Sequence, residues 1–128
     1  MEDLKKMSLK ELEDLCGDIR SEIIEVVCKN GGHLGPNLGV VELSTALHYV
    51  YNSPVDKIVW DVGHQSYVHK MLTGRRDRFH TIRKRGGLGP FTDPNESIHD
   101  QFISGHAGSA LSVSAGLAAA NPEKNVVV

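Results

Sequence analysis

Three histidines in this chain directly follow a glycine, and each pair lies at the edge of an expected helix or strand. The pairs are Gly32-His33, Gly63-His64 and Gly105-His106. An imidazole can transfer protons at neutral pH because its ordinary pKa lies near ~6.5. A neighbouring glycine lets a ligand approach the backbone, where N–H groups can bind a phosphate. A single loop histidine is more often a surface or capping residue, so the repeated Gly-His pattern carries the prediction of a binding site.

Zinc binding is the alternative role for these histidines, and their spacing disfavours it. His33, His64 and His106 lack the short paired spacing of structural zinc sites. His64 and His69 are five residues apart, which does not place them on one face of a helix, and no cysteine lies near them. We therefore expect no metal ligand among the residues of this chain.

A basic segment, Lys70–Arg85, carries seven basic residues and only one acidic residue, Asp77. One interpretation is a solvated face, and the other is phosphate recognition by Arg83 or by the Arg75-Arg76 pair. The chain as a whole has a net charge of -2 and a pI near 6.4, and the basic segment has no platform of interleaved aromatic residues. Nucleic-acid binding is therefore not expected.

The first half of the chain contains the signals of two helices. Ser8 and Glu11 form a capping box, apolar residues recur every three or four positions after it, and Asn30-Gly31-Gly32 ends the pattern. A glycine-rich loop, residues 33–37, leads to a second expected helix over residues 39–51. Its expected buried stripe consists of Val40, Leu43, Leu47 and Val50.

The second half alternates short apolar runs with helices. We expect a strand at 57–62, a helix at 66–73, a loop at 86–97, a brief strand at 102–104, a helix at 109–120 and a strand from Val126. Such alternation indicates an α/β layered domain with a mainly parallel sheet. Ligands of these sheets bind outside the carboxyl ends of the strands, so we expect His64 and His106 to face one crevice.

Composition and charge exclude several classes of protein. The chain has 128 residues, of which 40% are hydrophobic and 23% charged, as in an ordinary soluble domain. No apolar run approaches the ~20 residues of a membrane span, and the charged N-terminus does not resemble a secretory signal. Cys16 and Cys28 lie too far apart on the first helix to bridge, so we expect core or boundary positions for both and a cytoplasmic, reducing compartment. Trp60 is expected in the core.

Longer motifs carry a family resemblance that covers residues 9–128. Residues 20–39, which include Gly31-Gly32-His33-Leu34-Gly35, fit the N-terminal pattern of the transketolase superfamily. Ile58–Gln65, His69-Lys70 and Leu72–Asp77, extended by residues 81–91, are similar to one branch of it. The chain thus resembles the N-terminal part of the members of the 1-deoxy-D-xylulose-5-phosphate synthase family, which are enzymes that use thiamine diphosphate.

The resemblance implies a three-layer thiamine-diphosphate-binding fold with a mainly parallel sheet. It also implies a homodimeric transferase that condenses pyruvate with glyceraldehyde 3-phosphate, releasing carbon dioxide, in the biosynthesis of isoprenoid, thiamine and pyridoxol precursors. His33 would assist substrate binding and proton transfer, and His64 would contact cofactor and substrate. Gly105, His106 and Ala107 would contact the cofactor. The family commonly has hydroxyl residues after this Gly-His pair, so a side-chain hydrogen bond from Ala107 is not available.

The resemblance also implies that important parts of the site lie outside these residues. In the superfamily, the strand that begins at Val126 runs into a Gly-Asp-Gly that, with a later Asn, binds magnesium, and a later glutamate activates the cofactor. We therefore expect residues 1–128 to be the N-terminal portion of the first, diphosphate-binding domain, with the fold incomplete, the Mg²⁺ ligands beyond Val128 and the isolated chain inactive. A transketolase-like ketol transferase and a non-catalytic binding or assembly module remain as alternatives.

Overall fold

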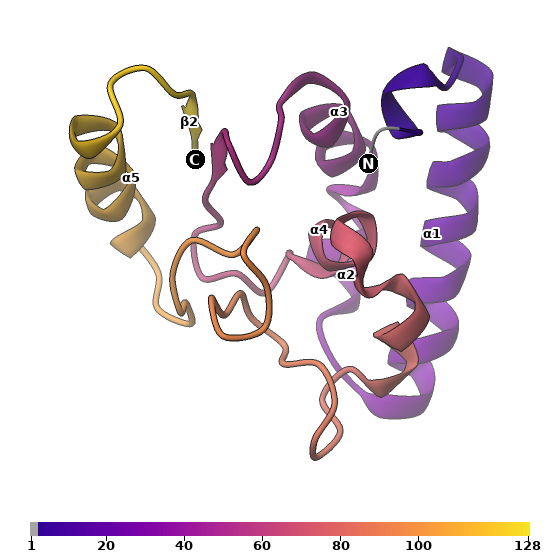
Figure 1. Cartoon of the computed structure of the whole chain (residues 1–128). Coiled ribbons are helices and arrows are strands. Elements are labelled where there is room, and N and C mark those ends of the chain that lie inside the picture. The colour runs from indigo at the N-terminus through magenta and orange to yellow at the C-terminus, as the bar shows by residue number, and fades with distance from the viewer. Residues whose placement is uncertain (1–2) are drawn as a thin grey trace.

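The computed structural model of the chain, which describes residues 3–128, packs α1 to α4 together and places α5 with β2 at the other end of the molecule (Figure 1). Three short helical turns, η1 to η3, accompany these elements. In chain order the elements are η1 (Leu4–Lys6), α1 (Leu9–Asn30), α2 (Leu34–Leu38), α3 (Val41–Val50), β1 (Lys57–Ile58), α4 (Tyr67–Lys70), η2 (Met71–Arg75), η3 (Arg76–Thr81), α5 (Ser109–Ala120) and β2 (Val126–Val127). A long loop, residues 82–108, joins η3 to α5.

The first helix begins and ends where the sequence predicts. The Oγ of Ser8 accepts a hydrogen bond from the Glu11 backbone N–H at 3.3 Å, and the Ser8 N–H donates to the Glu11 carboxylate at 2.7 Å. This capping box satisfies donors that the first turn of a helix leaves free. Gly31 follows the helix at a φ of 74°, a conformation that glycine adopts without strain.

The core lies between the inner face of α1 and the segment from α4 to Leu88. Ile19 and Ile23 of α1 are fully buried, as are Tyr67, Phe79 and Ile82. Each such side chain stabilises the fold by about 1.5–3 kcal/mol through burial of apolar surface. The α1–α4 region therefore holds the hydrophobic core from which the loops extend.

The two strands pair in parallel, in agreement with the predicted α/β class. Lys57 pairs with Val126 and Ile58 with Val127, and the Val59 N–H donates to the Val127 carbonyl at 2.8 Å. The first strand is shorter than the predicted 57–62. The second strand, expected from Val126, is confirmed.

The prediction for residues 33–51 is wrong in two respects. The predicted loop at 33–37 contains the short helix α2, and the buried face of the following helix is not the predicted apolar stripe of Val40, Leu43, Leu47 and Val50. The face of α3 that is buried consists of Val41, Ser44, Thr45 and His48, while Leu43 and Val50 are 55% and 64% exposed. Polar side chains can be buried here because Thr45 bonds to the Val41 carbonyl and His48 to His69.

Two smaller expectations also need correction. Residues 102–104 form no strand, and Ile103 is 66% exposed. The segment is instead held as a loop, in which the Thr92 hydroxyl donates to the Phe102 carbonyl at 3.0 Å. Cys16 and Trp60 are buried as expected, whereas Cys28 is exposed.

No helix within residues 3–128 combines the length and the apolar character needed to cross a lipid bilayer.

Candidate functional site

The structure brings His33 and His64 together, although 31 positions separate them in the sequence. Their ring centroids lie 5.5 Å apart in an edge-to-face arrangement. His33 is the residue before α2, and His64 lies in a turn that comes six residues after the end of β1. Two of the three predicted Gly-His pairs therefore meet at the carboxyl end of β1.

Asn37, a residue that the sequence analysis did not single out, connects these two histidines. Its fully buried side chain donates to the His33 carbonyl at 2.6 Å and to the His64 carbonyl at 2.8 Å. Its Oδ1 accepts from the Tyr67 backbone N–H at 2.9 Å, at the start of α4. One amide thus fixes both histidine backbones to the same helix.

Two aromatic side chains surround His33. The Tyr67 hydroxyl lies 3.4 Å from the His33 Nδ1 and accepts from the His33 backbone N–H at 3.3 Å. The Phe91 ring centroid lies 5.8 Å from that of His33. Glycine is required at position 32, because a Cβ there would lie 2.8 Å from the Tyr67 hydroxyl and the φ is 138°.

This environment favours the neutral form of His33. Burial lowers its pKa, and the nearby charges of His64 and Arg83 lower it further. A neutral imidazole at pH 7 can accept a proton and later return it. His33 is therefore suited to acid–base chemistry.

Unpaired polar atoms lie beside His64. The His64 Nδ1, the Gln65 Oε1 and the Ser104 Oγ are buried, and none has a hydrogen-bond partner. Buried polar atoms are nearly always paired, so these three are available to a ligand. The backbone at this turn is also unusual, because Val62 has a φ of 60°, which is rare for a β-branched residue and typical of functional sites.

The third Gly-His pair is attached to this turn indirectly. The Asp61 carboxylate accepts from the backbone N–H groups of Gly108 and Ala110 at 2.9 and 3.2 Å, and these bonds lower the pKa of Asp61. Gly105, His106 and Ala107 precede α5 as an exposed turn. Within residues 3–128 no hydrogen bond or ring contact joins His106 to His33 or His64, so the expectation that His64 and His106 face one crevice stays a prediction. The same described residues contain no cluster of three metal-ligating side chains.

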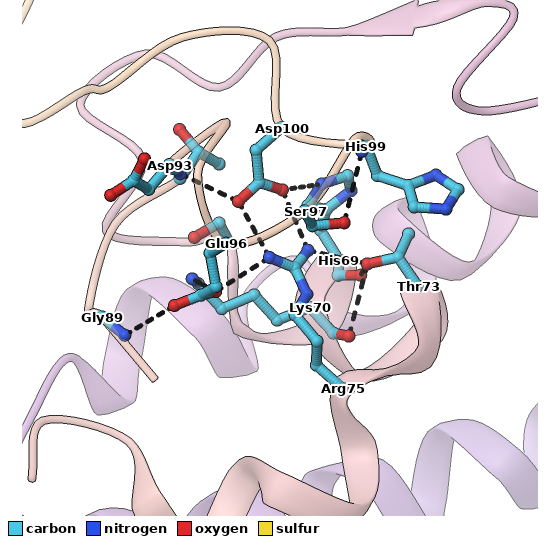
Figure 2. A network of polar contacts seen from close by, with 12 residues as sticks. His69, Lys70, Thr73, Arg75, Gly89, Asp93, Glu96, Ser97, His99 and Asp100 are labelled. Atoms are coloured by element: carbon cyan, nitrogen blue, oxygen red, sulfur yellow. Dashed lines mark hydrogen bonds and ion pairs between the residues drawn. The ribbon is translucent and has the colours of Figure 1, made fainter. Parts of the chain in front are cut away.

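A second group of polar residues, mostly buried, joins α4 and η2 to the loop 82–108 (Figure 2). The Arg75 guanidinium donates to both oxygens of Asp100 at 2.8 and 2.9 Å and to Glu96 at 2.9 Å. Lys70 forms an ion pair with the same Glu96 oxygen. We call Lys70, Arg75, Glu96 and Asp100 the ion-pair cluster.

The ion-pair cluster corrects the interpretation of the basic segment. Lys70 and Arg75 are buried and paired, so they form no solvated face and Arg75 is not free to bind a substrate phosphate. Arg76 is paired with Glu22 at 2.8 Å. Arg83 is exposed and its side chain lies beside Gly32, so phosphate recognition by this residue stays a prediction.

Two hydrogen-bonded histidines, His69 and His48, connect Asp100 to α3. Burial alone raises the pKa of Asp100, but hydrogen bonds from His69 and Arg75 and the Arg75 charge outweigh it and hold the carboxyl ionised. The His69 Nε2 must therefore donate to Asp100, at 2.9 Å. Because burial keeps His69 neutral, its Nδ1 accepts from the His48 Nε2 at 2.9 Å.

Burial lowers the pKa of His48 to about 3, which predicts a pH-dependent stability. Below pH ~6.5 the unfolded chain binds a proton that folded His48 does not, so stability falls as the pH falls toward 3. We expect His48→Gln, which keeps a donor for His69, to reduce the slope between pH 6 and 4.5 by about 1.4 kcal/mol per pH unit. Urea unfolding across this range measures the slope, with exposed His80→Gln as the control; equal slopes in wild type and His48→Gln would contradict the assignment.

Comparisons with known proteins agree with the motifs that meet at this site. The family model described as 1-deoxy-D-xylulose-5-phosphate synthase, N-terminal part, matches residues 1–127. A protein of that name from Thermomicrobium roseum is 61% identical over 120 residues, covering 93% of this chain and 19% of the relative. One from Caldanaerobacter subterraneus is 58% identical over 122 residues, covering 95% and 20%. The chain therefore spans about a fifth of the length of these relatives.

Proposed function

Because the chain belongs to the 1-deoxy-D-xylulose-5-phosphate synthase family, we propose that it forms the N-terminal part of the active site of such an enzyme. The complete enzyme would be a thiamine-diphosphate-dependent transferase that condenses pyruvate with glyceraldehyde 3-phosphate and releases carbon dioxide. The observation that carries the proposal is the His33–His64 pair, held by Asn37 at the carboxyl end of β1. This is the edge at which ligands of parallel α/β sheets bind.

The residues around His64 fit a polar cofactor with phosphate groups. The His64 Nδ1, the Gln65 Oε1 and the Ser104 Oγ are buried without partners, and they offer both donors and acceptors. A Cβ on Gly63 would lie 3.2 Å from the Ser104 Cβ and 3.4 Å from the Thr92 backbone nitrogen, so glycine at this position lets the loop residues pack closely against the His64 turn. Thiamine diphosphate, when bound, supplies the electron sink for decarboxylation, and the protein supplies orientation and proton transfer.

The residues of the candidate site would then have the following roles. His64 would hold the cofactor, and Gly105, His106 and Ala107 would contact it mainly through backbone groups. Neutral His33 would accept and return a proton on the substrate side, with Tyr67 fixing the orientation of its ring. The three-layer fold, the homodimer and the Mg²⁺ ligands would come from parts of the family enzyme beyond these residues.

The proposal predicts a specific choice of substrates. We expect a full-length enzyme that carries this chain as its N-terminal segment to consume pyruvate and glyceraldehyde 3-phosphate and to release carbon dioxide, only when thiamine diphosphate and Mg²⁺ are present. Coupled assays of pyruvate loss and carbon dioxide release measure this. Turnover of xylulose 5-phosphate with ribose 5-phosphate, and none of pyruvate, would contradict the proposal in favour of a transketolase-like enzyme.

The isolated 128-residue chain serves as the control for that assay. It would hold the histidine pair but none of the metal ligands expected beyond Val128, so we expect no turnover and no micromolar binding of thiamine diphosphate with Mg²⁺ in calorimetry. Micromolar binding by the isolated chain would show that these residues suffice for cofactor binding.

A further inference from the structure

We propose that the ion-pair cluster of Lys70, Arg75, Glu96 and Asp100 is a positioning device that holds the loop 89–100 against the His33–His64 pair. The proposal rests on the function proposed above for that pair. It assigns a role to four side chains that would not themselves touch substrate or cofactor.

The cluster joins the loop after η3 to the helical segment of α4 and η2. Lys70 and Arg75 come from the helical segment of α4 and η2, which is part of the core. Glu96 and Asp100 come from a loop with no helix or strand between residues 82 and 108. The two positive and two negative charges balance, and their pairing, together with the His69–Asp100 hydrogen bond, connects the loop to α4 and η2.

The two carboxylates also fold the loop onto itself. Glu96 accepts from the Gly89 backbone N–H at 2.8 Å, and Asp100 accepts from the Asp93 backbone N–H at 2.9 Å. Figure 2 shows Arg75 pointing toward the space between these carboxylates, so each of them bonds at once to the loop backbone and to the basic side chains. A movement of the carboxylates would therefore move the whole loop.

The part of the loop between these anchors meets the candidate site. Phe91 lies two residues after Gly89, and its ring centroid is 5.8 Å from that of His33. The Thr92 backbone nitrogen borders the space above Gly63, next to His64. The loop thus supplies one side of the environment that keeps His33 partly buried.

Stability alone does not account for such a cluster. Replacing a buried ion pair by apolar residues of similar volume is often neutral or stabilising, because desolvation of the charges offsets their attraction. Charged groups with fixed directions instead determine where a flexible segment lies. The carboxylates bond to the backbone of Gly89 and Asp93, on either side of Phe91, and this placement favours the positioning role.

The test is made in the full-length enzyme with Lys70→Met/Glu96→Leu. This double variant removes both charges together, so neither is left buried and unpaired, and the Arg75–Asp100 pair is kept. We expect the loop to loosen and kcat to fall roughly 10- to 100-fold, because small displacements of positioned groups have effects of this size. The matched control, Lys29→Met/Glu25→Leu, makes the same changes in an exposed ion pair of α1 and should leave kcat unchanged.

A second readout separates positioning from general destabilisation. NMR of ¹³C-labelled histidine rings gives the pKa of His33, which should rise in the double variant because the ring is less shielded from water. Phe91→Ala should produce the same rise. Adding Lys70→Met/Glu96→Leu to Phe91→Ala should then change the His33 pKa no further, since the cluster acts through Phe91.

The outcomes are distinct. A wild-type His33 pKa in the double variant, or effects that add to those of Phe91→Ala, would overturn the positioning role. Loss of folding in the double variant, seen by circular dichroism, would also overturn it, because the cluster would then be a stability element. Absence of pyruvate turnover in the wild type would refute the proposed function, while the NMR measurement would still decide the role of the cluster.

Discussion

Replacing His64 by alanine in a full-length enzyme that carries this chain is expected to lower kcat, or the affinity for thiamine diphosphate, by about 10²- to 10⁴-fold. The His64 Nδ1 is buried and has no partner within the described residues, and the ring packs edge to face on His33. Removing the imidazole would therefore delete a cofactor contact and one side of the His33 environment together. Steady-state kinetics and calorimetric titration of the cofactor measure the two effects separately.

The control for this prediction is His80→Ala. His80 is exposed on η3, and its ring Nδ1 bonds only to the Asp77 carbonyl at 3.0 Å. Wild-type kinetics are expected for that variant. Wild-type kinetics and cofactor affinity in His64→Ala would remove His64 from the site.

Replacing Asp100 by asparagine is expected to destabilise the chain by about 3–5 kcal/mol, the cost of leaving a buried charge without its partner. The Asp100 carboxylate accepts from His69 and Arg75 on Oδ1, and from Arg75 and the Asp93 backbone on Oδ2. An asparagine amide nitrogen cannot accept hydrogen bonds, so two of these donors would face another donor. Urea unfolding at pH 7 measures the loss.

The pH dependence identifies the cause of that loss. Because the pKa of Asp100 lies far below its ordinary value, its stabilising contribution is complete above pH ~4 and is lost as the pH falls further. The difference between wild type and Asp100→Asn should therefore shrink below pH 4. Asp14→Asn, which breaks the exposed Lys10–Asp14 pair, should have little effect at any pH. A small loss of stability in Asp100→Asn at pH 7 would contradict the cluster geometry.

Local signals in the sequence were enough to predict most helix boundaries. The capping box of Ser8 and Glu11, the glycine after Asn30 and the end of α5 at Asn121 all depend on neighbours within a few residues. The buried face of α3 was predicted wrongly because it depends on distant partners. His48 can be buried because its ring bonds to His69, and Thr45 can be buried because its hydroxyl bonds to the Val41 carbonyl and to Cys16. The predicted apolar stripe assumed instead that only hydrophobic side chains face the core.

The candidate site was predicted in part for the same reason. The Gly-His pattern indicated His33 and His64, which the structure brings together, but nothing in their neighbourhood indicated that Asn37 connects them. The basic residues Lys70 and Arg75 were expected near the surface because their acidic partners, Glu96 and Asp100, lie 21 to 26 positions later in the chain. Pairing over such separations becomes visible only when the fold is known.

The central claim, that thiamine diphosphate binds at the His33–His64 pair, is tested most directly by chemical footprinting of the full-length enzyme. Diethyl pyrocarbonate modifies neutral imidazoles, and peptide mass spectrometry reports the rate at each histidine. With thiamine diphosphate and Mg²⁺ present, we expect protection of His33, His64 and His106 and an unchanged rate at exposed His80. Equal rates at His64 with and without the cofactor would contradict the account.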